Sequence, residues 1–145
     1  YFSHKTDYPL ARNMKIIFRE AGLINTLKES VKINLIFFRS QKADDIQNQE
    51  IIKTCTEKSF EIINHLKPKV IVTEGFKTFE VLLRQFKSKE SKAHEFKNRR
   101  TIRIGFAGDE PRLFGLIHPS GGHGISKDLL QNMGGFLKEQ LKGFR

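Results

Sequence analysis

The chain has little cysteine: one residue, Cys55, among 145. A single cysteine excludes an internal disulfide and a cysteine-based zinc site. Cys55 lies in a helical pattern, where a small core residue is a more common role than a nucleophile. Because disulfide-poor chains are typical of reducing compartments, we expect an intracellular, cytoplasmic protein.

Long apolar runs are also absent. The longest, from Ile33 to Phe38, is interrupted by Asn34 and is far too short to span a bilayer. The N-terminal segment is polar and has no apolar region of the signal-peptide kind. We therefore expect no membrane association. The chain begins with Tyr1 rather than Met, and we expect that Tyr1 is not its biological start.

Positive charge is in excess. The chain has 26 Lys and Arg against 16 Asp and Glu, a net charge of +10. Such an excess fits a polyanionic partner, nucleic acid first, although an uninvolved basic surface gives the same total. A hydrophobic content of 38% is that of an ordinary globular protein. We expect one domain over residues 1–145 that is monomeric.

Apolar periodicity indicates alternating helices and strands. The segment from Lys87 to Arg100 shows no such period and is basic, so we expect a surface connection or, alternatively, a DNA-facing loop. The alternation predicts a three-layer α/β/α domain with a mainly parallel four-stranded central sheet. The expected helices are Leu10–Ala21, Ile52–Leu66, Phe79–Phe86 and Leu130–Leu141, and the expected strands are Lys32–Phe38, Lys69–Thr73, Ile102–Phe106 and Leu113–Ile117.

Polar residues follow three of the expected strands. In open parallel sheets ligands bind outside the carboxyl ends of the strands. These ends are Arg39-Ser40, Glu74-Gly75 and His118-Pro119-Ser120. The sequence therefore predicts a site where these ends meet.

His118 is the first candidate for chemistry. It follows an apolar strand, and Pro119 restricts the backbone beside it. The glycines after Ser120 allow backbone amides to approach a ligand or phosphate closely. A lone histidine at a strand end is more often structural, but this context favours a functional role.

Asn34 is the second candidate, because it interrupts an apolar strand pattern. Burying an amide costs ~1–3 kcal/mol unless its hydrogen bonds are satisfied. One interpretation is a satisfied structural amide at a sheet edge. The other uses its donor and acceptor to read the edge of a nucleic-acid base.

Two other classes of site fit less well. A hydrolase with Ser120 as nucleophile and His118 or His123 as base lacks the Gly-x-Ser-x-Gly turn. A metal site built from the two histidines lacks further acidic or thiol ligands nearby. We therefore expect neither a metal nor a cofactor.

Several segments together resemble the uracil-DNA glycosylase superfamily, in the same order along the chain. Residues 116–121 resemble that family's histidine loop, and residues 68–75 its strand ending in glycine. The resemblance extends from Phe2 to about Leu141. The remaining segments that carry it are Tyr1-Phe2-Ser3, Pro9-Leu10, Asn13-Met14 and Ile33-Asn34-Leu35.

The resemblance implies excision of a base that has been flipped out of DNA. Phe2 would stack on the uracil, and Asn34 would pair with its N3–H and O4. His118 would donate a hydrogen bond to O2 as negative charge develops on the departing ring. Ser120 would help to hold the substrate at a phosphate beside the lesion. The remaining DNA contacts would come from Ser40, Gly121, Gly122 and His123.

Two features depart from the family pattern. Its water-positioning Asp or Asn would lie before Tyr1, together with the first strand. Gly121 and Gly122 stand where the best-known branch has a wedge leucine, with His123 and Ile125 the nearest bulky residues. We expect a glycosylase for uracil or a related deaminated base. The alternative is a catalytically weak or inactive nucleic-acid-binding member of the same fold.

Overall fold

A computed structural model describes residues 8–35, 48–106, 108, 111–120 and 124–142. By its internal contacts the chain falls into two units. The first consists of Tyr1–Ser30 and Val70–Arg145, and the second of Val31–Lys69. The two are described separately.

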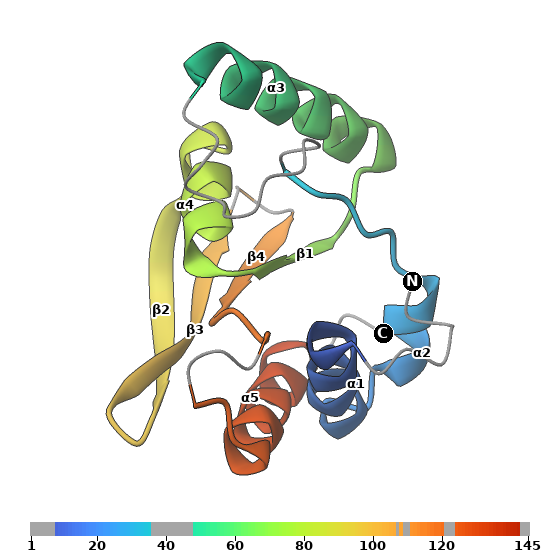
Figure 1. Ribbon diagram of the computed structural model, residues 1–145, viewed down its shortest axis with the longest axis vertical. Coiled ribbons are helices and arrows are strands. Elements are labelled where there is room, and N and C mark those ends of the chain that lie inside the picture. Colours follow the sequence, from blue (N-terminus) through green and yellow to red (C-terminus); the bar gives the residue numbers. More distant parts are fainter. Residues whose placement is uncertain (1–7, 36–47, 107, 109–110, 121–123, 143–145) are drawn as a thin grey trace. The chain divides into compact units, whose positions relative to one another are not determined.

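A four-stranded sheet forms the centre of the first unit, in the order β1-β4-β3-β2 (Figure 1). Strand β1 pairs in parallel with β4, whereas β4–β3 and β3–β2 are antiparallel. The expected α/β class and four-stranded sheet are confirmed, but the expectation of a mainly parallel sheet is wrong because the sheet is mixed. The strands are β1 Val70–Glu74, β2 Lys89–Phe96, β3 Arg99–Phe106 and β4 Arg112–Leu116.

Strand β2 explains the error. Residues 87–100 were expected to form a surface connection or a DNA-facing loop, but most of this stretch forms β2, a tight turn and the start of β3. β2 lies at the edge of the sheet, where charged side chains are common because they discourage pairing with other chains. Register shifts near Ser91 and between His94 and Glu95 interrupt its alternation further.

Helices cover both faces of this sheet. Helix α4 (Phe76–Gln85) packs on one face, and Phe79 is fully buried against Gly115. Helices α1 (Pro9–Glu20) and α5 (Lys127–Gln140) pack on the other face, over a core that includes Ile102, Ile104, Phe114 and Leu116. A short helix, α2 (Ile24–Glu29), follows α1 and buries Leu27 in the same core.

Gly134 allows α1 and α5 to approach each other closely. A Cβ atom on Gly134 would lie 2.5 Å from the Ile17 carbonyl oxygen and from the Glu20 Cβ. A side chain there would therefore force the helices apart. A Cβ on Gly135 would meet nothing within 4 Å. Of these two glycines of α5, only Gly134 is therefore at a close helix–helix contact.

The second unit contains helix α3 (Gln49–Leu66), as the sequence predicts. Asn48 caps its start by accepting hydrogen bonds from the Glu50 and Ile51 amides. Cys55 is 2% exposed, which agrees with a core role. Of the expected strand Lys32–Phe38, residues 32–35 form neither helix nor strand, and residues 36–38 lie outside the described part.

None of the helices described is both long and apolar enough to cross a membrane.

Candidate functional site at the carboxyl ends of β1 and β4

The carboxyl ends of the parallel strands β1 and β4 lie together, as expected. Glu74 pairs with Leu116, and the Gly75 amide donates a 2.9 Å hydrogen bond to the Leu116 carbonyl. Beyond this point His118 passes close to Gly75, because a Cβ on Gly75 would lie 3.5 Å from the His118 Cδ2. Gly75 has φ +114°, a conformation that side chains rarely adopt, so a glycine is required there.

His118 is exposed at this edge, and its imidazole orientation is set by its own loop. The Ser120 amide donates a 3.3 Å hydrogen bond to Nδ1. In a neutral imidazole one nitrogen accepts and the other donates. With Nδ1 accepting, Nε2 carries the hydrogen and is the donor available to a ligand.

Asn13 of α1 anchors the loop that contains His118. Its Nδ2 donates a buried 2.7 Å hydrogen bond to the carbonyl oxygen of Pro119. Pro119 itself is fully buried. The hydrogen bond between Asn13 and Pro119 joins residues 106 positions apart, so it could not be predicted from the local sequence. The sequence shows only that a polar residue, Asn13, shares the buried face of α1 with Met14 and Ile17, and this does not identify its partner.

Two further hydrogen bonds hold the strand ends. The Thr73 hydroxyl donates to the Gly75 carbonyl at 3.1 Å, and the Ile117 amide donates to the Thr101 carbonyl at 2.8 Å. Thr73 is buried. His118 therefore projects from a backbone that is tied to β1, to β3 and to α1.

The structure brings together only part of the expected site. His118 and Ser120 are both exposed and share the 3.3 Å contact. Asn34 belongs to the second unit, where it is exposed and in no strand, so its expected place within a buried strand is wrong. Its carbonyl accepts from the Ser59 hydroxyl at 3.3 Å. The expected contacts Phe2, Ser40, Gly121, Gly122 and His123 lie outside the described residues.

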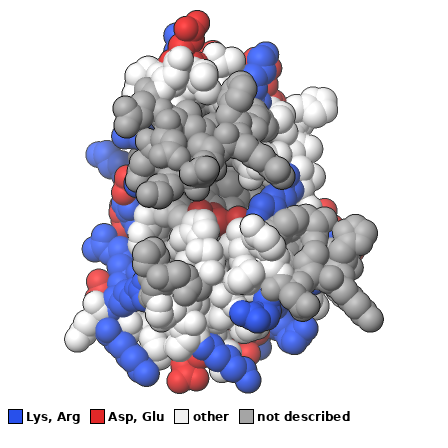
Figure 2. Space-filling view, in the orientation of Figure 1, with Lys and Arg blue, Asp and Glu red and all other residues white. Residues whose placement is uncertain are grey.

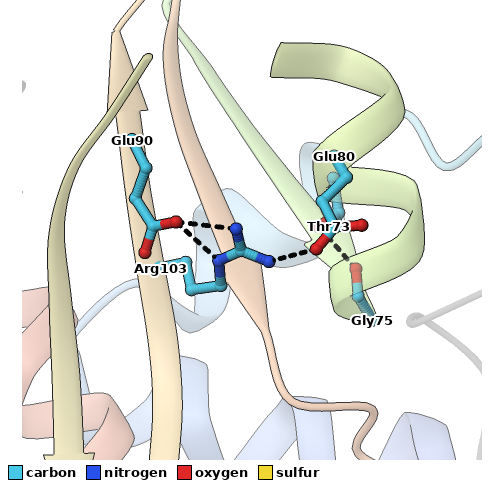
Figure 3. Close-up of polar contacts among 5 residues, drawn as sticks. All are labelled: Thr73, Gly75, Glu80, Glu90 and Arg103. Atoms are coloured by element: carbon cyan, nitrogen blue, oxygen red, sulfur yellow. Dashed lines mark hydrogen bonds and ion pairs between the residues drawn. The ribbon is translucent and has the colours of Figure 1, made fainter. Parts of the chain in front are cut away.

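An ionic cluster on the α4 face of the sheet was not anticipated from the sequence (Figure 3). Arg103 of β3 donates from Nε and Nη2 to Glu90 Oε2, at 3.0 and 2.6 Å, and from Nη1 to Glu80 Oε1 at 2.6 Å. Its guanidinium also lies over the ring of Phe79, 5.1 Å from the centroid.

The surroundings of Arg103 indicate a structural role. Hydrogen bonds to Glu90 hold the pKa of the guanidinium above its usual value, with a smaller contribution from Glu80, although burial acts in the opposite direction. The side chain is 14% exposed. Because both carboxylates already occupy the guanidinium, it ties β2, β3 and α4 together rather than binding an anion.

Among the described residues, no group of three or more His, Cys, Asp or Glu side chains is placed to hold a metal ion.

Comparison with known proteins adds no relative: no family model matches the chain, and neither the curated proteins nor the solved structures give a match. The fold and site alone define a basic α/β domain with an exposed histidine loop at the carboxyl ends of two parallel strands.

Proposed function

We propose that the chain is a DNA base-excision glycosylase that hydrolyses the N-glycosidic bond of uracil or a related deaminated base flipped out of the helix. The observation that carries this proposal is the exposed His118, whose Nδ1 accepts from the Ser120 amide, which leaves Nε2 as the donor of a neutral imidazole. The resemblance of residues 116–121 to the glycosylase histidine loop gives that donor its role.

The chemistry needs a fixed donor at this position. When the bond between the sugar C1′ and the base N1 breaks, the electron pair stays on the base and negative charge develops at O2. Water adds to C1′ and supplies the proton that the base finally takes up. A preorganised hydrogen-bond donor stabilises such charge more than it stabilises the ground state. The Asn13–Pro119 contact and the β3 contact of Ile117 provide that preorganisation.

A DNA partner agrees with the net charge of the chain, which is +10. Phosphate contacts supply most of the sequence-independent affinity of DNA-binding proteins. Under this proposal Asn34 reads the uracil edge, because a carboxamide offers a donor to O4 and an acceptor to N3–H.

The direct experiment is base release by the full-length protein. Labelled oligonucleotides with one uracil, single-stranded and duplex, are incubated with the protein, and alkali then cleaves the strand at abasic sites. Matched oligonucleotides with thymine serve as controls. We expect cleavage that depends on uracil. If neither substrate releases its base, the glycosylase proposal is wrong, and DNA binding without release would identify the inactive nucleic-acid-binding alternative.

A substitution tests the base-reading role separately. Asn34→Asp removes the donor that faces O4, so excision of uracil should drop sharply. Because Asn34 is exposed, the folded state should be little affected. Excision at the wild-type rate would show that Asn34 does not read the base, while leaving the role of His118 open to its own test.

A further inference from the structure

The turn between β2 and β3 is short and basic. Phe96 pairs with Arg99, so Lys97 and Asn98 alone form the loop, at φ 50° and 61°. Two positive φ values in a two-residue loop define a type I′ hairpin turn. Lys97, Asn98 and Arg100 are exposed. We call residues 97–100 the hairpin tip.

The hairpin tip lies at the same end of the sheet as His118. Ile102 pairs with Leu116, and the Ile117 amide donates to the Thr101 carbonyl at 2.8 Å. Arg100 precedes Thr101 and His118 follows Ile117, so both residues lie beyond this hydrogen bond at the same end of the sheet. Figure 1 shows the β2–β3 turn and the end of β4 at one end of the sheet. This basic stretch, expected to be a surface connection or a DNA-facing loop, therefore lies at the same end of the sheet as the candidate site.

The hairpin also extends beyond the rest of the sheet. Strand β3 begins at Arg99, but its pairing with β4 begins only at Ile102. At roughly 3.4 Å per residue, the tip reaches about 10 Å past the last β4 pair. Figure 2 shows Lys and Arg side chains along the lower left of this face, where Figure 1 places the turn.

Contacts with α5 hold the hairpin in place just before the tip. The His94 ring stacks on Phe136, with centroids 4.1 Å apart, and His94 Nε2 lies 2.7 Å from Asn132 Oδ1. Thr101 donates its hydroxyl hydrogen to the His94 carbonyl at 3.2 Å. Phe96 packs against the core of the first unit. The basic residues are thus presented on a fixed support, which lowers the entropy cost of binding.

The positive charge of the hairpin tip favours a polyanionic ligand. From Phe96 to Ile104 the sequence contains no acidic residue, while residues 97–100 include Lys97, Arg99 and Arg100. The acidic neighbour is Glu95, which pairs with Arg100 across the hairpin. Phosphates spaced along a nucleic-acid strand suit such a row of cations, because each contact releases condensed counterions.

We infer that the hairpin tip binds the phosphate backbone of the DNA strand beside the base held at His118. That the strand carries an extruded base rests on the proposed function, whereas the phosphate contact can be tested by itself. The tip acts as a rigid clamp that positions the strand and reads no sequence. Its affinity is the same for undamaged oligonucleotides.

The test compares two pairs of neutralising substitutions by binding to a fluorescent oligonucleotide without uracil, over a range of NaCl concentrations. Lys97→Asn with Arg100→Gln removes two of the three charges of the hairpin tip, those of its exposed cations. Arg84→Gln with Lys89→Gln removes the same charge elsewhere, from the last turn of α4 and from the start of β2, where Lys89 pairs with Phe106. Asn favours positive φ, so the tip variant keeps its turn, and its thermal midpoint should match that of the wild type.

We expect the tip variant to bind on the order of tenfold more weakly at low salt, with a salt slope smaller by about 0.7–0.9 for each lost contact. The variant at Arg84 and Lys89 should bind nearly as the wild type does. Glu95→Gln should tighten binding, because it removes the acidic neighbour of Arg100. Equal losses in both variants would show a general charge effect and overturn the inference. If the tip variant loses affinity for vesicles of anionic lipid but binds the oligonucleotide as the wild type does, the inference is also wrong.

Base release by the same variants separates the two proposals. If the full-length protein releases no uracil but the tip variant loses oligonucleotide affinity, the glycosylase proposal fails and the clamp stands. If uracil is released and the tip variant keeps both its affinity and its KM, the clamp fails and the glycosylase proposal stands. We expect a raised KM with little change in kcat, since the tip contacts the strand and not the reacting atoms.

Discussion

The two halves of the central sheet are built on different principles. Strands β1 and β4 are parallel and largely apolar, and β4 is buried along Leu113–Leu116. The hairpin of β2 and β3 is antiparallel, and its outer strand is charged and mostly exposed. The parallel half ends in His118, and the hairpin ends in its basic tip. Packing determines the geometry of the first half, and under the inference above the cations of the hairpin tip determine the affinity for DNA. Substitutions at His118 should therefore affect the rate of base release, and neutralising substitutions at the hairpin tip should affect binding.

The largest effect is expected at His118. His118→Ala removes the donor to the departing base, so uracil release should slow by about 10²–10³-fold in single-turnover reactions. Because the side chain is exposed, the unfolding midpoint should remain that of the wild type. Ser120→Ala keeps the amide that bonds Nδ1. Its effect should therefore be confined to substrate binding, and its single-turnover rate at saturating protein should match that of the wild type. A His118→Ala protein that retains most of its single-turnover rate would exclude His118 from the chemistry.

Gly115 tests the packing of the parallel half. A Cβ at this position would lie 2.6 Å from Cγ of Phe79, which is fully buried. Gly115→Val should lower the free energy of unfolding by about 1–3 kcal/mol or more, measured by urea denaturation. Gly135→Ala is the matched control: it meets no atom within 4 Å and should stabilise α5 by up to about 1 kcal/mol. Equal stability of the two variants would contradict the observed packing.

Arg103 tests what holds the hairpin against α4. Arg103→Met leaves Glu80 and Glu90 without their cation and should cost about 1–3 kcal/mol of unfolding free energy. The cost is below that of a fully buried pair because Glu80 is 51% exposed. The raised pKa keeps Arg103 charged throughout the accessible pH range, so its own titration adds no pH dependence. Adding Glu80→Gln and Glu90→Gln should recover part of the loss; no recovery would mean that the ion pairs contribute little.

Asn13 tests how the loop is positioned. Asn13→Ala leaves the buried Pro119 carbonyl without its 2.7 Å partner and should cost about 1–2 kcal/mol. Because Asn13 acts through the loop, base release should slow while binding of undamaged DNA is unchanged. The imidazole ¹⁵N spectrum of His118 reports whether Nδ1 remains the acceptor. If Asn13→Ala changes neither the spectrum nor the rate of base release, Asn13 contributes to stability alone.

Much of the parallel half could be predicted from sequence, because burial leaves a periodic apolar pattern. The strands near Val70 and Leu113 follow from that pattern. β2 could not be predicted in the same way, since an exposed edge strand with two register shifts has no apolar period. The Asn13 contact joins residues 106 positions apart, and no local signal specifies such a partner.

The smallest effect is expected within the turn itself, where stability and charge can be separated. Asn98 has φ 61°, which glycine adopts more easily than asparagine, and glycine is preferred at the second position of a type I′ turn. Asn98→Gly should raise the free energy of unfolding by roughly a few tenths of a kcal/mol, near the limit of thermal denaturation measurements. Oligonucleotide affinity should not change, because no charge is lost. If Asn98→Gly weakens DNA binding as much as neutralising Lys97 and Arg100 does, the tip acts through the Asn98 side chain or the shape of the turn rather than through its cations. Surface charge would then not be what distinguishes the hairpin from the parallel half of the sheet.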